Sequence, residues 1–396
     1  MARILMTWEL GGGYGHLAPL LSLARPLQRS GHEVTFAVRD VAAAEAVLGG
    51  SGIPYFPAPA NFQLRAPTAL HSYPQILLNT AFNDADDLRA RVRAWQNLLA
   101  LVKPDLLVCD HSPTALLAVR GRGLPCLLTG TGFSVPPDVK ALPELRPWAP
   151  ADAAVLQADE ARALDMANAV ARDLGLPKLN YLAELCSQAT PALFTLRELD
   201  CYAAQRPGAD YWGPLPGPGG EAPRWPEGEG KRVFIYGQPF ESLPQVLEQL
   251  RQGKHRVLVY VPRIAPKLKQ KFRSERLHFA DTLQDMGRIT AEADCAVMTN
   301  GHTTAAAMLL AGKPVLLLPQ HLEMLLIAMN VEAAGAGLSA PLLKLEGILG
   351  KLERLLNEPA FTEKAQAIAA RYRGKLDAES AGRNFLAAAT RLLKGG

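Results

Sequence analysis

A run of three glycines near the start of the chain constrains the fold more than any other feature. The run, Gly11 to Gly13, follows the short apolar segment 4–6 and precedes residues 17–30, whose apolar spacing predicts a helix. A strand, a glycine-rich turn and a helix start form the layout in which backbone N–H groups reach a bound ligand. We therefore expect His16, at the end of the turn, to face whatever the loop holds.

The same alternation of strand and helix continues through the first half of the chain. The predicted strands are residues 3–6, 33–38, 106–109 and 126–129, and the predicted helices are residues 17–30, 42–48 and 112–119. Apolar strands separated by helices indicate a parallel sheet covered on both faces. The proline-rich stretch 56–95 fits this pattern poorly.

A second alternating region follows a connection rich in proline and glycine, residues 206–231. Its predicted strands are 232–236, 256–261, 295–298 and 314–318, its predicted helices are 246–251 and 303–310, and residues 363–393 are helical with a break at Arg373-Gly374. The sequence thus predicts two doubly wound, Rossmann-like α/β domains, residues 1–205 and 232–375. Residues 376–396 are expected to form a helix that packs back on the first domain. Ligands of such sheets bind beyond the carboxyl ends of the strands, so two facing domains would share a cleft.

Composition restricts the classes of function. The chain has 396 residues, of which 20% are charged, and a net charge of only +4 without a basic run, which argues against nucleic acid as a partner. The first residues lack a signal-peptide layout, and no apolar segment approaches the ~20 residues that span a bilayer. Cys109 and Cys295 lie in apolar runs, as reduced buried thiols do. These features favour a cytoplasmic protein and give no indication of membrane association.

The glycine loop and a later aspartate suggest acid–base chemistry. The loop does not match the dinucleotide-binding pattern, so a nicotinamide cofactor is weakly supported. Asp110 ends the predicted strand 106–109, and a carboxylate there can orient His16 and stabilise its cation. Two alternatives remain for Asp110: it only caps the next helix, or His111 is its partner. The loop itself could be a tight turn that holds no ligand.

The segment Thr299 to Thr304 follows another predicted strand and opens a helix. Free N–H groups, hydroxyls and the positive end of the helix dipole suit a diphosphate. The alternative is an ordinary capped helix, with Asn300 or Thr303 as the N-cap. Gln320 and Glu323 follow the next strand, and Glu323 can accept hydrogen bonds from sugar hydroxyls. Taken alone, Glu323 is better explained as an exposed acid at a helix start.

Taken together, these segments resemble the nucleotide-sugar-dependent glycosyltransferases of the GT-B fold. The likeness is greatest to the macrolide, rhamnolipid and plant secondary-metabolite transferases. It rests on GGGYGHLAPLLSLARPLQRSGHEVTF, on YWGPL at residues 211–215, and on TNGHTTAAAMLLAGKPVLLLPQHLEMLLIAMNVEAAGAGL at residues 299–338. The glycine run is also similar to that of the peptidoglycan lipid-intermediate N-acetylglucosaminyltransferase.

The resemblance implies a role for each matching residue. His16 would be the base that deprotonates an acceptor hydroxyl, and Asp110 the aspartate that polarises it. The first domain would bind a small-molecule or lipid acceptor. The second would bind a nucleotide-diphosphate sugar, with UDP as the expected nucleotide, and neither a metal nor a further cofactor is expected. The residues expected to bind the donor are Gly12, Gly13, Gly237, Gln238, Asn300, Gly301, His302, Thr303, Thr304, Gln320 and Glu323.

Some positions depart from the family pattern. The phosphate turn lacks the usual histidine before its glycine and has His302 after it, and Met324 stands where glutamine is common. An apolar Met324 favours a deoxysugar or an altered sugar pose. A nucleotide-sugar epimerase and a catalytically impaired nucleotide-sugar-binding protein are the alternatives. The proline- and aromatic-rich region Pro54 to Pro74, with Phe82 and Trp95, is predicted to line an apolar acceptor pocket, and so is Phe133. Core packing is the other interpretation of these aromatic residues.

Overall fold

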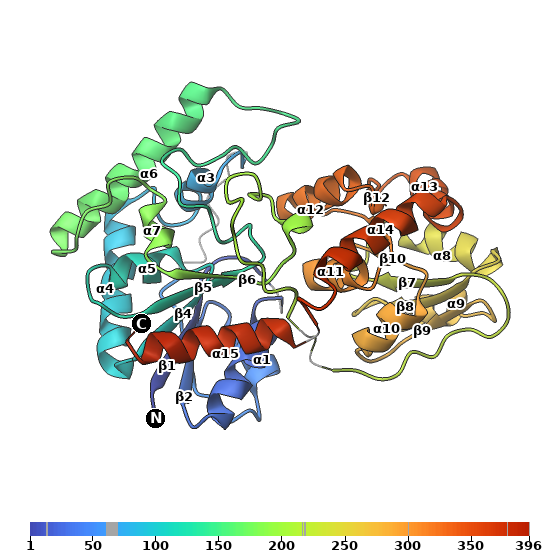
Figure 1. Ribbon diagram of the computed structural model, residues 1–396, viewed down its shortest axis with the longest axis horizontal. Helices are drawn as coiled ribbons and strands as arrows, with labels where there is room; N and C mark the ends of the chain where they lie inside the picture. The colour runs from blue at the N-terminus through green and yellow to red at the C-terminus, as the bar shows by residue number, and fades with distance from the viewer. Residues whose placement is uncertain are drawn as a thin grey trace. The chain divides into compact units, whose positions relative to one another are not determined.

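The chain forms two compact units, each built on a six-stranded parallel sheet with helices packed on it (Figure 1). The computed structural model describes residues 1–12, 15–60, 70–215, 217, 219–299, 301–377 and 379–395. The first unit comprises Met1–Phe194, Tyr202–Trp212 and Ala381–Gly396, and the second comprises Thr195–Cys201 and Gly213–Ser380. The prediction of two doubly wound α/β domains is confirmed.

The sheet of the first unit has the strand order β3-β2-β1-β4-β5-β6. Its strands are β1 (Arg3–Trp8), β2 (Glu33–Val38), β3 (Tyr55–Pro57), β4 (Leu106–Asp110), β5 (Cys126–Gly130) and β6 (Thr190–Leu193). The chain builds outward from β1 to β3 and then returns to place β4 on the other side of β1. The crevice between the carboxyl ends of β1 and β4 is therefore the switch point, where α/β sheets bind ligands.

Helices cover this sheet, and four of them lie in segments without a predicted element. The helices are α1 (Leu17–Arg29), α2 (Val41–Leu48), α3 (Tyr73–Leu78), α4 (Ala85–Val102), α5 (Pro113–Val119), α6 (Ala153–Asp173), α7 (Glu184–Ser187) and α15 (Ser380–Leu393). Asp84 caps α4 by accepting from two backbone N–H groups, and Leu88, Val92 and Trp95 are buried along one face of α4. The capping and spacing signals of α4 were thus present in the sequence.

Two aromatic residues predicted to line an acceptor pocket belong to the core instead. Phe82 and Trp95 are fully buried in the hydrophobic cluster of the first unit. Phe133 is partly buried and packs against the same cluster. The pocket prediction is therefore wrong for Phe82 and Trp95, whose rings fill the interior under α4.

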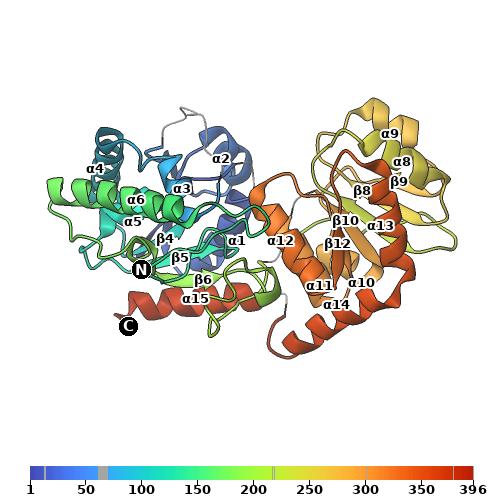
Figure 2. The same cartoon turned by 90° about the horizontal axis from the view of Figure 1, so that it is seen from above.

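The last helix of the chain belongs to the first unit. Figures 1 and 2 show α15 alongside β6, and the rings of Phe194 and Phe385 lie 6.4 Å apart. Before it, α14 ends at Tyr372, and Gly374 adopts a positive φ of 74°. The predicted break at Arg373-Gly374 is confirmed.

The sheet of the second unit has the order β12-β11-β10-β7-β8-β9. Its strands are β7 (Arg232–Tyr236), β8 (Arg256–Tyr260), β9 (Leu277–Phe279), β10 (Cys295–Met298), β11 (Val315–Leu317) and β12 (Gly337–Ser339). The helical elements are η1 (Arg197–Leu199), α8 (Leu243–Gln252), α9 (Pro266–Phe272), α10 (Met286–Glu292), α11 (His302–Leu310), α12 (Leu322–Ala333), α13 (Leu345–Asn357) and α14 (Pro359–Tyr372). The switch point of this sheet lies between β7 and β10.

The chain passes between the units once within the predicted linker, between Trp212 and Gly213, and also before and after residues 195–201 and after Ser380. Thr195 to Cys201 belongs to the second unit, where the Thr195 hydroxyl lies 2.7 Å from His302 Nε2. Residues 202–212 belong to the first unit, where the Trp212 N–H donates to the Leu193 carbonyl. The stretch 206–231 is thus divided between the units.

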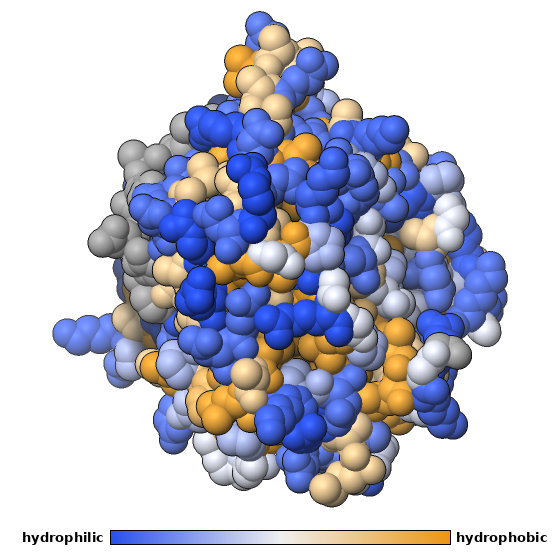
Figure 3. Space-filling model, turned by 90° about the vertical axis from the view of Figure 1, so that its left-hand side faces the viewer, coloured by the Kyte–Doolittle hydropathy of each residue, from blue (hydrophilic) through white to orange (hydrophobic). Residues whose placement is uncertain are grey.

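On the side of the first unit shown in Figure 3, hydrophilic residues surround small, separate apolar areas, as is usual for a protein surface. Cys109 and Cys295 are fully buried free thiols, as predicted. None of the helices within the described residues is long and apolar enough to cross a membrane.

Candidate active site

His16 and Asp110 form a pair at the switch point of the first sheet. His16 is the N-cap residue of α1, directly after the glycine loop, and Asp110 is the last residue of β4. His16 Nδ1 lies 2.9 Å from Asp110 Oδ2, and the histidine side chain keeps about a quarter of its surface exposed. The pairing predicted from the sequence is therefore formed. A carboxylate at Nδ1 fixes the ring and stabilises its cation, as a general base requires.

A residue at the end of β1 and the first glycine of the loop lie against the imidazole on other sides. The Trp8 ring stacks on the His16 ring, with centroids 5.2 Å apart and planes inclined by 19°. His16 Nε2 lies beside Gly11, where an added Cβ would come within 2.3 Å of that nitrogen. Gly11 also has a φ of 93°, so both its backbone and its missing side chain suit this position.

Asp110 does not cap the helix that follows it. The first backbone N–H groups of α5 donate instead to Glu9: Thr114 N to Oε2 at 3.2 Å and Ala115 N to Oε1 at 2.7 Å. The capping alternative for Asp110 is therefore excluded. Glu9 is buried, and this burial raises its pKa to about 7.

His111 lies next to the pair but is not the partner of Asp110 in this structure. Its backbone has a φ of 44°, which is unusual for a residue other than glycine, and its carbonyl accepts from the Leu10 N–H. Its ring is buried beside Tyr73, and burial lowers its pKa to about 3, so the ring is neutral at pH 7. His111 thus shapes the turn after β4.

The second group of candidates follows three adjacent strands of the second sheet. Gly237 and Gln238 come after β7, Gly301 to Thr304 after β10, and Gln320 and Glu323 after β11. The Thr299 hydroxyl links the first two loops, since it accepts from the Gln238 N–H at 2.7 Å. The carboxyl edge at the second switch point is thus built from the predicted segments.

The turn before α11 exposes backbone donors without a side-chain cap. Gly301 is the N-cap residue, has a φ of 105°, and makes no capping hydrogen bond through a side chain. Tyr236 packs against it so closely that an added Cβ would lie 2.7 Å from the ring. Among the described residues, the first N–H groups of α11 therefore have no side-chain N-cap acceptor, which is the state in which helix starts bind anions.

His302 contributes its backbone rather than its ring to this turn. The ring is buried, Nε2 is engaged by Thr195, and burial lowers its pKa to about 4. A ligand at the turn would meet the His302 N–H. Thr303 is half-buried and Thr304 is buried, with its hydroxyl facing Gly301.

The β11–α12 segment presents Gln320 and Glu323 but not Met324. Gln320 is exposed, and Glu323 is half-buried in the first turn of α12. The Met324 side chain packs in the core of the second unit with only 2% of its surface exposed. Met324 is therefore not the apolar neighbour of a sugar that the sequence suggested, because its side chain points into the interior.

The remaining predicted donor residues are placed differently. Gly12 lies in the first unit, exposed on the loop that precedes His16. Gly13 and Asn300 lie outside the described residues.

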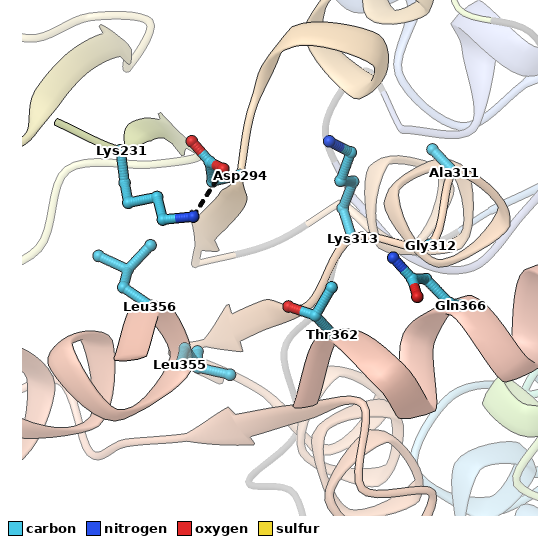
Figure 4. A pocket seen from close by; sticks show the side chains of 9 residues that line it. All are labelled: Lys231, Asp294, Ala311, Gly312, Lys313, Leu355, Leu356, Thr362 and Gln366. Carbon is cyan, nitrogen blue, oxygen red and sulfur yellow. Dashed lines mark hydrogen bonds and ion pairs between the residues drawn. The ribbon is translucent and has the colours of Figure 1, made fainter. Parts of the chain in front are cut away.

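A small pocket of about 130 Å³ occurs at the opposite edge of the second sheet (Figure 4). Lys231, Asp294 and Lys313, which line it, precede β7, β10 and β11 respectively. Figure 4 shows the ion pair between Lys231 and Asp294, whose atoms lie 3.4 Å apart. Since ligands of these sheets bind beyond the carboxyl ends, this pocket is not part of the candidate site.

Sequence reasoning assigned no individual role to Trp8, Glu9, Gly11, Thr299 or Tyr236, although Gly11 and Thr299 lie in segments that it singled out. Glycine at position 11 was visible in the sequence as part of a run, but its contact with His16 was not. The other four act through contacts with residues far along the chain or across the loop, which spacing does not reveal.

Comparison with known proteins identifies the fold. No protein-family model matches the chain, and no curated protein sequence matches it. Three similar solved structures are the spinosyn rhamnosyltransferase SpnG (20% identity, TM-score 0.66, all of both chains covered), the calicheamicin glycosyltransferase CalG4 (17%, 0.70, 100% of this chain and 98% of that one), and the glycosyltransferase VinC in complex with dTDP (16%, 0.64, all of both chains covered). The likeness extends through both units, and the chain therefore has the GT-B fold of these structures.

Proposed function

We propose that the chain is a glycosyltransferase that moves a sugar from a nucleotide-diphosphate sugar to a hydroxyl of a small-molecule acceptor. The observation that carries the proposal is the His16–Asp110 pair at the first switch point. The uncapped turn before α11 supports it, because a helix start suits a diphosphate. Solved structures of the same fold include SpnG with a spinosyn aglycone and SpnG with thymidine diphosphate.

In the proposed reaction, the acceptor oxygen forms a bond to the anomeric carbon of the sugar. The bond from that carbon to the diphosphate oxygen breaks, and the acceptor proton goes to His16. Asp110 stabilises the resulting imidazolium, and such base assistance is typically worth ~10²–10⁴-fold in rate. The N–H groups of the α11 turn stabilise the negative charge of the leaving diphosphate.

Replacing His16 separates chemistry from donor binding. We expect His16→Ala to lower the turnover number about 10²-fold or more while the Kd of the donor stays unchanged, because the α11 turn lies in the second unit. Donor binding is measured first, by thermal shift with UDP, dTDP and GDP and their sugar conjugates, since a ligand of the native state raises the melting temperature. Transfer is then measured by mass spectrometry with the donor that binds and a set of hydroxyl-bearing acceptors.

His32→Ala is the matched control, because His32 accepts from the Ala2 N–H at the other end of β1. Full turnover in His16→Ala would exclude His16 as the general base. Conversion of the donor sugar without any acceptor would instead identify an epimerase. Binding without any turnover would identify a catalytically inactive binding protein.

A further inference from the structure

A buried carboxylate joins the two segments that carry His16 and Asp110. Glu9 follows β1 directly, and its side chain is only 3% exposed. It accepts from Thr114 N at 3.2 Å, Thr114 Oγ1 at 2.8 Å and Ala115 N at 2.7 Å. These donors belong to the first turn of α5, which begins three residues after Asp110.

Glu9 takes the place of a local N-cap for α5. The Ser112 side chain, at the N-cap position, donates to the Asp110 carbonyl at 3.0 Å and caps no N–H group. The N–H groups of a first helical turn need an acceptor when they are buried. The position of the β4–α5 turn therefore depends on a side chain of the β1 segment.

Further hydrogen bonds fix the same junction. The Leu10 N–H donates to the His111 carbonyl at 3.1 Å, directly beside Glu9 and Asp110. On the interior side, Trp95 Nε1 donates to Thr114 Oγ1 at 2.9 Å, and that hydroxyl donates onward to Glu9. The junction is thus a chain of buried hydrogen bonds that ends on the carboxylate.

We propose that Glu9 is a positioning residue, an inference that rests on the proposed function. The ionised carboxylate of Glu9 sets the spacing of the His16–Asp110 pair, and protonation of Glu9 weakens the hydrogen bond within that pair. An ionised carboxylate is acceptor-only and suits three converging donors. A protonated carboxyl brings its own O–H into the same space, and one of the donors then loses its acceptor.

Glu9 changes its protonation state near neutral pH. Burial raises its pKa to about 7, although the hydrogen bond from the Thr114 hydroxyl acts in the opposite direction. The charged group that faces Glu9 from α4 is Arg91, which is itself paired with Asp87 at 2.8 Å. The Tyr73 phenol of α3 and the Cys109 thiol of β4 also face Glu9, and burial raises the pKa of each, so both stay neutral.

The test follows the His16 ring by NMR in the full chain, with ¹⁵N-labelled histidine, between pH 5.5 and 8.5. In the wild type, we expect the His16 signals to show their own titration and a second step caused by Glu9. In Glu9→Gln, which keeps the shape and an acceptor oxygen, the second step disappears. Glu160→Gln is the matched control, since Glu160 is another acid whose pKa burial raises, and it accepts from the Leu142 N–H instead of from the β4–α5 turn.

A second variant keeps the test decisive if Glu9→Gln folds poorly. Thr114→Val removes a hydrogen bond that favours the ionised form, so the second step must move to higher pH. Identical His16 titration in wild type, Glu9→Gln and Thr114→Val would overturn the proposal.

These signals do not depend on turnover, so the proposal can fail while glycosyl transfer holds, and the reverse. If both hold, the turnover number of Glu9→Gln at pH 8 falls by up to about 10²-fold with an unchanged donor KM.

Discussion

Three neighbours act on three different parts of the His16 imidazole. Asp110 bonds to Nδ1, Trp8 covers one face of the ring, and Gly11 leaves space beside Nε2. The side chain that would take a proton is thereby held in one orientation before any substrate arrives. Such preorganisation is what a base near the protein surface needs in order to act at a defined atom.

A methyl group at position 11 tests this arrangement. We expect Gly11→Ala to abolish most turnover, because the new Cβ would lie 2.3 Å from His16 Nε2 and displace the ring. The same change carries backbone strain of about 1–2 kcal/mol, since φ is 93°. Turnover is measured with the donor and acceptor found above, and stability is measured by urea unfolding.

Gly31→Ala is the control that separates backbone strain at a positive φ from the steric clash with the His16 ring. Gly31 has a φ of 81°, and an added Cβ there meets nothing within 4 Å. Both variants should lose similar stability, and only Gly11→Ala should lose activity. Equal activity in the two variants would show that the space beside Nε2 is unimportant.

At the scale of elements, the start of α11 is formed by a glycine that an aromatic ring holds in place. Tyr236 ends β7 and packs on Gly301, which precedes α11 with a φ of 105°. The close approach brings the N-terminus of α11 next to the end of β7. The donors at the helix start are thus directed by contact between a strand and a turn.

We expect Gly301→Ala to weaken binding of a nucleotide diphosphate at least tenfold, about 1.4 kcal/mol, because the added Cβ would meet Tyr236 at 2.7 Å. Isothermal titration calorimetry with the nucleotide selected by thermal shift measures the change. Gly374→Ala, with a φ of 74° and open space around it, is the control in the same unit. Unchanged affinity in Gly301→Ala would place the diphosphate elsewhere.

The strands of both sheets could be predicted more completely than the helices. Apolar or alternating runs predicted β2, β7 and β10 with their observed bounds. The helices α4 and α6 were missed because prolines and polar residues around them obscured the spacing of their buried residues. Residues Leu88, Val92 and Trp95 show that spacing clearly once the Asp84 cap is recognised.

The site was predictable only where the order of strands determines proximity. His16 and Asp110 follow adjacent strands of one sheet, so their meeting could be expected from the topology. The contact of Glu9 with Ala115 spans 106 positions and depends on which way one side chain turns. The burial of the His302 ring against Thr195 depends on residues 195–201 belonging to the second unit, which no local pattern in the sequence indicates.

Across the whole molecule, both units carry a buried neutral imidazole near a switch point. His111 has its pKa lowered to about 3 and His302 to about 4, in each case chiefly by burial. Below the ordinary histidine pKa of 6.5, these two histidines therefore bind protons in the unfolded chain but remain neutral in the folded chain. Stability that is present above pH 6.5 is lost as the pH falls toward 4.

Replacing His302 removes one of these contributions. We expect the stability of the wild type relative to His302→Gln to decrease by about 2 kcal/mol between pH 7 and pH 5. Urea unfolding at several pH values measures the difference, in which the opposite contribution of Glu9 cancels. A difference that stays constant with pH for His302→Gln would contradict the burial argument.

The route of the chain has a practical consequence for building hybrid enzymes. Each unit is assembled from separate stretches: residues 195–201 belong to the second unit, and the final helix belongs to the first. A single cut within the connection 206–231 therefore yields two incomplete fragments. A chimaera that borrows the second unit from a relative must exchange two stretches at once and retain its own carboxyl-terminal helix. Recombination at one crossover would pair β6 with an α15 from the relative. The contact between the Phe194 and Phe385 rings would then be among those replaced by a mismatched pair.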